Sequence, residues 1–124
     1  GTVGGLVGLN LAGATISNSY AKVNVSGDNT SGGLVGDNLG DVYFCYAVGR
    51  VYGDEPVGGL VGRQGPDGRV VDSYYDMETS DLSDTGKGTP VSLVDMMRIS
   101  TFSHWDMERI WYLNEFNAET PVLR

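Results

Sequence analysis

Gly4-Gly5-Leu6-Val7-Gly8 is the first of three copies of one five-residue box, and the other copies are Gly32–Gly36 and Gly58–Gly62. Successive boxes lie 28 and 26 residues apart. Each box is followed by a small residue and a tyrosine, in the pairs Ser19-Tyr20, Cys45-Tyr46 and Ser73-Tyr74. The distance from a tyrosine to the next box leucine is 14 residues in both cases, so the length difference lies between the box and the tyrosine. This periodicity indicates an array in which equivalent elements stack on one another.

The repeat unit contains β-favouring pieces and no helical pattern. Apolar residues do not recur at the i, i+3, i+4, i+7 spacing of an amphipathic helix, which excludes paired-helix repeats. Three short β-favouring pieces surround Leu34-Val35, Val42 to Tyr46 and Arg50-Val51, with Gly, Asn or Asp between them. A β-propeller blade needs about 40 residues and four longer strands, more than this unit offers. The sequence therefore predicts a mainly β fold, a parallel β-solenoid of about three coils.

Comparison of the copies predicts which way the side chains point. Leu6, Leu34 and Leu60 form the best interior ladder, and the small Ser19, Cys45 and Ser73 suit a narrow interior corner. Strand alternation then places Tyr20, Tyr46 and Tyr74 outward, on the face of the variable Asn18, Phe44 and Asp72. A bend beside the tyrosine would reverse this assignment.

The composition changes near residue 74. Seventeen of the 19 glycines precede residue 75, whereas both tryptophans and all four methionines follow it. We predict repeats in residues 1–74 and an α+β capping segment in residues 75–124. Thr89 can N-cap a short helix near residues 90–98, with Pro90 at its first position. The aromatic residues are expected to cover the open end of the last coil, where unpaired backbone would invite aggregation.

Charge excludes several functions. The formal net charge is -8, which argues against nucleic acid, because phosphate backbones bind through Lys and Arg clusters. No apolar run reaches the roughly 18 residues of a membrane span. The single Cys45 and the single His104 accompany no nucleophile motif, so we expect no enzyme activity.

Two sets of residues are candidate binding sites. The carboxylates of Asp76, Glu78, Asp81 and Asp84 could supply oxygen ligands to calcium, the only cofactor considered, although a solvated acidic turn is the favoured alternative. The ladder of Tyr20, Tyr46 and Tyr74 could stack sugars or present an aromatic stripe to a partner. The favoured alternative is that these rings stack on each other.

The repeat resembles the GLUG motif. The resemblance rests on the glycine box, an Asn two residues later (Asn10, Asn38), Asn18-Ser19-Tyr20-Ala21, and the closing Val25-Ser26-Gly27 and Val51-Tyr52-Gly53. Phe44-Cys45 in the second copy and Gln64-Gly65-Pro66 in the third depart from it. The tail from Ser73-Tyr74 onward resembles the segment that commonly follows a GLUG array. By this resemblance, the chain is the C-terminal part of an array in a bacterial or archaeal protein.

The resemblance implies a secreted or cell-surface, adhesin-like protein. We therefore expect a non-catalytic structural or adhesive module that mediates protein or glycan interaction. Its expected partners are further repeats of a longer parent chain and a surface protein or glycan. The alternatives are a fragment of a β-helical carbohydrate-active enzyme and an accessory domain of a secreted peptidase.

Overall fold

The three glycine boxes lie side by side in the computed structural model, which describes all 124 residues. Val7 and Val61 both pair with Val35 of the middle box. The first coil comprises β1 (Val3–Gly4), β2 (Val7–Asn10), β3 (Thr15–Ser17), β4 (Tyr20–Lys22) and β5 (Val25–Ser26). The second comprises β6 (Ser31–Gly32), β7 (Val35–Asn38), β8 (Asp41–Tyr43), β9 (Tyr46–Val48) and β10 (Val51–Tyr52). The third comprises β11 (Val57–Gly58), β12 (Val61–Gln64), β13 (Arg69–Val71) and β14 (Tyr74–Asp76).

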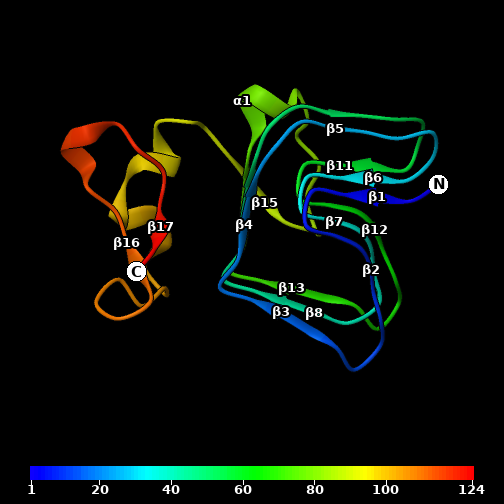
Figure 1. The fold of residues 1–124 in the computed structure, drawn as a ribbon, viewed down its shortest axis with the longest axis horizontal. Helices are drawn as coiled ribbons and strands as arrows, with labels where there is room; N and C mark the ends of the chain where they lie inside the picture. Colours follow the sequence, from blue (N-terminus) through cyan, green and yellow to red (C-terminus); the bar gives the residue numbers. More distant parts are fainter.

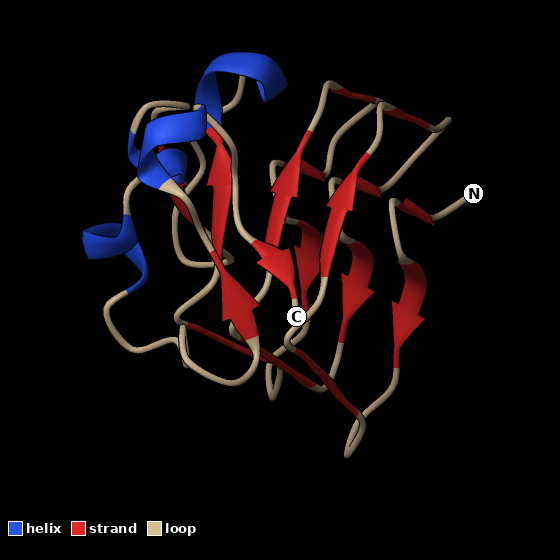
Figure 2. Cartoon of the chain, turned by 60° about the vertical axis from the view of Figure 1, so that its left-hand side comes forward, coloured by secondary structure: helices blue, strands red, loops and turns tan.

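Every strand pair between coils is parallel, which confirms the predicted β-solenoid. Figures 1 and 2 show equivalent strands of successive coils side by side. The first two coils contain five short strands each, not the expected three β pieces. One reason is that Asn18, Phe44 and Asp72 adopt positive φ angles of 47°, 55° and 47°. The left-handed bend interrupts the piece that was expected to run from Val42 to Tyr46.

The interior is narrow and aliphatic. Leu34 and Leu60 are fully buried, as predicted, whereas Leu6 in the outermost coil is 49% exposed. The box glycines permit close backbone approach: a Cβ on Gly32 would lie 1.9 Å from the carbonyl oxygen of Val35. A Cβ on Gly33 would lie 2.1 Å from the carbonyl oxygen of Gly59 in the next coil. Coils at this spacing therefore require glycine in the box.

A polar ladder runs through one corner of the stack. The Asn10 side-chain Nδ2 donates to Asn38 Oδ1 at 2.8 Å, and Asn38 Nδ2 donates to Gln64 Oε1 at 3.2 Å. Asn10 and Asn38 are buried, and a buried amide needs such partners. Gln64, a departure from the motif, therefore continues the ladder of the two asparagines.

The C-terminal segment begins with α1 (Met77–Ser80), which Asp76 caps, and continues to β15 (Thr89–Val91). The short 3₁₀ helices η1 (Asp95–Met97), η2 (Ile99–Phe102) and η3 (Glu115–Asn117) follow, together with the antiparallel pair β16 (Trp111–Tyr112) and β17 (Val122–Leu123).

The prediction of a short helix near residues 90–98 is wrong. Residues 89–91 instead form a parallel strand against β14, and only a 3₁₀ turn follows. The unpaired edge of β14 offers these residues backbone partners, which override the local capping pattern around Thr89 and Pro90.

Candidate functional site

The three tyrosines of the repeat lie in the sheet of β4, β9 and β14, outside the aliphatic interior. Their outward direction agrees with the alternation, because Ala21, Ala47 and Tyr75 beside them point inward. The rings of Tyr20 and Tyr46 stack with centroids 5.0 Å apart and planes 3° from parallel. Tyr46 is fully buried, and Tyr20 and Tyr74 are half-buried.

The C-terminal segment covers this tyrosine face. A buried cluster of Met96, Phe102, Trp105, Trp111 and Leu113 packs against it. Trp111 lies 5.9 Å from Tyr20 and 6.0 Å from Tyr46 between ring centroids, and Phe102 meets Tyr74 edge-on at 5.4 Å. In Figure 1 the segment from η1 to β17 stands beside β4. The aromatic residues thus cover the side of the stack and not its end, and the ladder is an internal interface here, not an open ligand platform.

Polar contacts tie the segment to every coil. Trp111 Nε1 donates to Asn18 Oδ1 of the first coil at 3.4 Å, and the Tyr46 hydroxyl of the second donates to the carbonyl oxygen of Pro121. In the third coil, the carbonyl oxygen of Asp72 accepts from Trp105 Nε1 at 2.8 Å. Burial raises the pKa of Tyr46 and, less strongly, that of Tyr74. The segment therefore acts as a lateral clamp, defined as residues 92–124.

A different piece of chain, residues 82–88, closes the end of the third coil. Lys87 Nζ donates to the carbonyl oxygens of Val57 at 2.9 Å and Gly62 at 2.7 Å. Asp84 Oδ1 accepts from the backbone N–H of Gly59 at 3.1 Å, and the Asp84 backbone carbonyl accepts from the Tyr75 hydroxyl at 2.7 Å. Lys87 and Asp84 thus satisfy backbone groups of the third coil, which has no further coil at this position to supply hydrogen-bond partners.

The four carboxylates considered for calcium are not brought together. Asp76 is buried and accepts from the Glu78 backbone N–H and the Thr79 hydroxyl, whereas Asp84 belongs to the end closure. Glu78 Oε1 accepts from the backbone N–H of Leu93, and Asp81 is exposed. No group of three or more potential metal ligands converges anywhere in the chain. In this structure Asp76, Glu78 and Asp84 each accept hydrogen bonds from different groups of the chain, and Asp81 faces solvent.

Neither Cys45 nor His104 forms a catalytic arrangement. Cys45 is fully buried in the interior, and burial raises the pKa of its thiol to about 11. A thiol of this kind is not an activated nucleophile. His104 is exposed on the lateral clamp, with its Nδ1 3.1 Å from Asp72 Oδ1.

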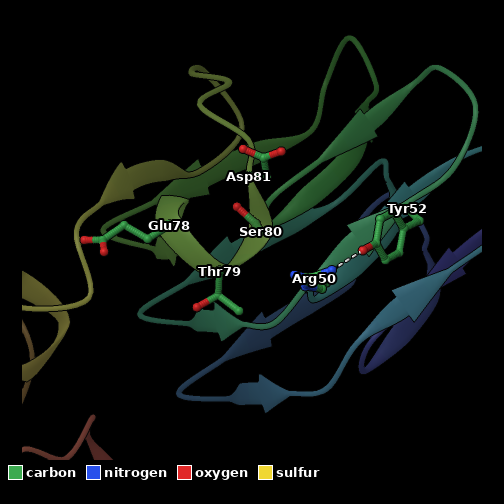
Figure 3. Close-up of a pocket in the computed structure, with 6 residues that line it drawn as sticks. All are labelled: Arg50, Tyr52, Glu78, Thr79, Ser80 and Asp81. Atoms are coloured by element: carbon green, nitrogen blue, oxygen red, sulfur yellow. Dashed lines mark hydrogen bonds between the residues drawn. The ribbon is translucent and has the colours of Figure 1, made fainter.

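A polar hollow lies between β10 and α1. Six residues line a cavity of about 190 Å³: Arg50, Tyr52, Glu78, Thr79, Ser80 and Asp81. Figure 3 shows Arg50 and Tyr52 on one side and the four helix-end residues on the other. The sequence pattern does not predict this hollow. Arg50 directly precedes β10 and Tyr52 ends it, so alternation places both on one face, but nothing in the sequence places α1 opposite them.

Comparison with known proteins supports the repeat assignment. The sequence model of a family described as "The GLUG motif" matches residues 1–26. A protein of Evansella cellulosilytica described as "Putative Gly-rich membrane protein" is 44% identical over 109 residues, which covers 79% of this chain. The chain spans only 13% of the length of that relative. No solved structure matches the chain.

No helix in the structure is both long and apolar enough to cross a membrane. From its three stacked boxes and these matches, the chain is a GLUG-motif repeat protein.

Proposed function

We propose that the chain is a non-catalytic structural and adhesive module of a secreted or cell-surface protein, in which it mediates protein or glycan interaction. The main support for this proposal is the register of the coils. Equivalent residues lie beside one another through three coils, so each added coil lengthens the stack and its lateral surface. The name of the Evansella cellulosilytica relative also supports a surface setting.

The first coil supports the further proposal that its outer side packs against another coil of the same repeat, joined before Gly1. The strands β2, β3 and β4 each stand at the edge of their sheet. The exposed apolar side chains of this coil are Leu6, Leu9, Leu11 and Val23. No charged side chain occurs before Lys22. Solvent-facing sheet edges in native proteins usually carry charges or bulges that prevent pairing, whereas β2 and β3 carry no charge and β4 carries only Lys22 at its end.

Extending the array tests this proposal about the edge. The register aligns Gly1 with Asn29 and Glu55, so a copy of residues 29–54 placed before Gly1 continues the stack. Its addition should raise the unfolding midpoint, because the first coil then gains a neighbour interface on its outer side. A scrambled copy of these residues is the matched control. An equal midpoint for the two extended chains would contradict the proposal.

Two assays test the adhesive, non-catalytic function. Beads coated with the chain should be retained on plates coated with bacterial polysaccharides or extracellular proteins, whereas beads coated with albumin should not. The soluble chain should release no reducing ends from the same polysaccharides. Turnover that a single Asp or Glu substitution abolishes would replace this proposal with a carbohydrate-active enzyme.

A further inference from the structure

We propose that a second hollow, on the seam between the coils and the lateral clamp, binds a short free peptide with aliphatic side chains. This inference goes beyond the proposed function, because a free peptide is a soluble ligand and not a surface to which the chain adheres. The seam hollow measures about 460 Å³, within the roughly 300–1,000 Å³ that is usual for small-molecule sites. Its size favours a dipeptide over a single amino acid.

The seam hollow exists only where the clamp meets the coils. Lys22 and Val48 contribute from the coils, where they stand side by side at the ends of β4 and β9. All the other lining residues belong to the clamp, which stands beside β4 (Figure 1). A ligand in this hollow therefore contacts both parts and should hold the clamp against the coils.

The walls are mainly apolar. Five of the eight lining residues are hydrophobic, and each keeps part of its surface exposed: Val48, Leu93, Met97, Ala118 and Val122. The hydroxyl of Thr120, which is buried, already forms a hydrogen bond with the Tyr46 hydroxyl at 3.1 Å. An aliphatic side chain packed against these walls removes further apolar surface from water, so the walls favour an aliphatic ligand.

The two remaining lining residues carry opposite charges. Lys22 and Glu119 are both exposed, and neither forms an ion pair within the chain. The Lys22 ammonium lies over an aromatic ring, 5.9 Å from the ring centroid of Tyr20. The hollow therefore offers one cation and one anion to a ligand.

These charges select the chemistry of the ligand. An aliphatic acid without an ammonium group would bring its charge near Glu119, and an aliphatic amine would bring its charge near Lys22. A free peptide joins an ammonium, a carboxylate and aliphatic side chains in one molecule, so it can meet Glu119, Lys22 and the apolar walls together.

The first test is a titration of the ¹⁵N-labelled chain with leucyl-leucine, followed by amide chemical shifts. The shifts should be confined to residues 22, 48, 93–97 and 118–122, with an affinity in the millimolar range. Seryl-serine has the same charged ends without the aliphatic groups, so it should bind more than about tenfold more weakly. The absence of shifts with leucyl-leucine, or equal affinity for the two dipeptides, would overturn the proposal.

The charged ends are tested one at a time. Leucyl-leucine amide lacks the carboxylate and N-acetyl-leucyl-leucine lacks the ammonium, so each should bind about three- to fivefold more weakly, the value of one exposed ion pair. Lys22→Met should abolish only the preference for the free acid over the amide. Glu119→Gln should abolish only the preference for the free amine over the acetylated peptide. If both preferences persisted in both variants, the assignment of Lys22 and Glu119 to the ligand would be wrong.

Arg109→Met is the matched control for Lys22→Met. Arg109 is exposed on the clamp and lines no hollow, so its substitution removes one positive charge away from the site. Both preferences should survive in this variant. Loss of the preference for the free acid in Arg109→Met as well would assign it to the overall charge of the chain and overturn the site.

Thermal stability supplies an independent readout. The seam hollow requires the clamp to lie on the coils, so leucyl-leucine at about tenfold above its dissociation constant should raise the unfolding midpoint by a few degrees. Seryl-serine at the same concentration should leave the midpoint unchanged. Equal midpoints with the two dipeptides would contradict binding at the seam.

Discussion

Leu6 and Leu60 occupy equivalent positions at opposite ends of the stack, yet Leu60 is fully buried and Leu6 is 49% exposed. The difference arises from what lies beyond each coil. Beyond Leu60 the chain returns and Gly88 packs so closely that a Cβ there would lie 2.7 Å from the Cβ of Leu60. The glycine box therefore brings its leucine to the interior position, but only a neighbouring segment removes that leucine from water.

The two ends also differ in charge at equivalent strand positions. Arg63, Asp37 and Leu9 align across three coils, as do Arg69, Asp41 and Thr15. Arg63 pairs with Asp37 at 2.7 Å, whereas Leu9 is exposed on the other side of Asp37. The third coil thus has the charged edge of a finished sheet, and the first coil has an edge suited to continued stacking.

The largest effect should come from an acid in the interior ladder. Leu34→Asp should cost more than about 5 kcal/mol and unfold the array, because it removes a packed side chain and buries an unpaired carboxylate. Leu6→Asp, at the same position of the box, should cost under about 1 kcal/mol, because the site is half open to water. Circular dichroism with urea titration measures both. Equal losses would mean that Leu6 in the first coil and Leu34 in the middle coil do not differ in burial as described.

The lateral clamp should contribute nearly as much. Trp111 is fully buried and contacts Tyr20 and Tyr46 of two different coils. Trp111→Ala should therefore cost about 3–5 kcal/mol. The adjacent Tyr112 is exposed, so Tyr112→Ala should cost about 0.5 kcal/mol. Thermal melts distinguish the two, and an unchanged midpoint for Trp111→Ala would show that the clamp does not stabilise the coils.

The repeated coils and the C-terminal segment differ in how far the sequence could predict their structure. The boxes recur at a nearly constant period, so the solenoid and its leucine ladder followed from spacing alone. The direction of Tyr20, Tyr46 and Tyr74 followed from alternation, because the left-handed residue of each coil precedes the small residue and does not separate it from the tyrosine. Repetition reports which positions are equivalent in successive coils.

Repetition does not report what a non-repeated segment will contact. The tail was expected to cover the end of the stack, but its aromatic cluster packs against the tyrosines, and Lys87 and Asp84 close the end. The local pattern at Thr89 and Pro90 predicts a helix, and pairing with β14 overrides it. The hollow beside Tyr52 depends on where α1 comes to lie, which is a tertiary contact with no local pattern.

Alkaline pH should produce the next largest effect, through Cys45 in the interior. Its thiol pKa is raised from 9.0 to about 11 by burial, so the unfolded chain loses this proton first. The stabilisation from the protonated, buried thiol of Cys45 is fully present below pH 9. As the pH rises to about 11, the free energy of unfolding falls by a total of about 2–3 kcal/mol on account of this group.

Cys45→Ser isolates this contribution. Serine occupies the equivalent positions 19 and 73, and the titrating tyrosines remain the same in both proteins. Urea unfolding at pH 8 and pH 11 should show a smaller fall for Cys45→Ser than for the wild type. Parallel curves would mean that the thiol is not desolvated in the folded chain.

The smallest of these effects concerns the closed end itself. Lys87→Met keeps most of the apolar stem but removes the two hydrogen bonds to the carbonyl oxygens of Val57 and Gly62. We expect a loss of about 1–3 kcal/mol, because those acceptors are then left without their partner. Arg63→Met is the matched control: its ion pair with Asp37 lies on the surface and is worth under about 1 kcal/mol. If Arg63→Met lowered the free energy of unfolding more than Lys87→Met, the charged edge of the last coil would stabilise it more than the end closure does. Chemical denaturation of both variants decides between these two, since neither change touches the interior ladder.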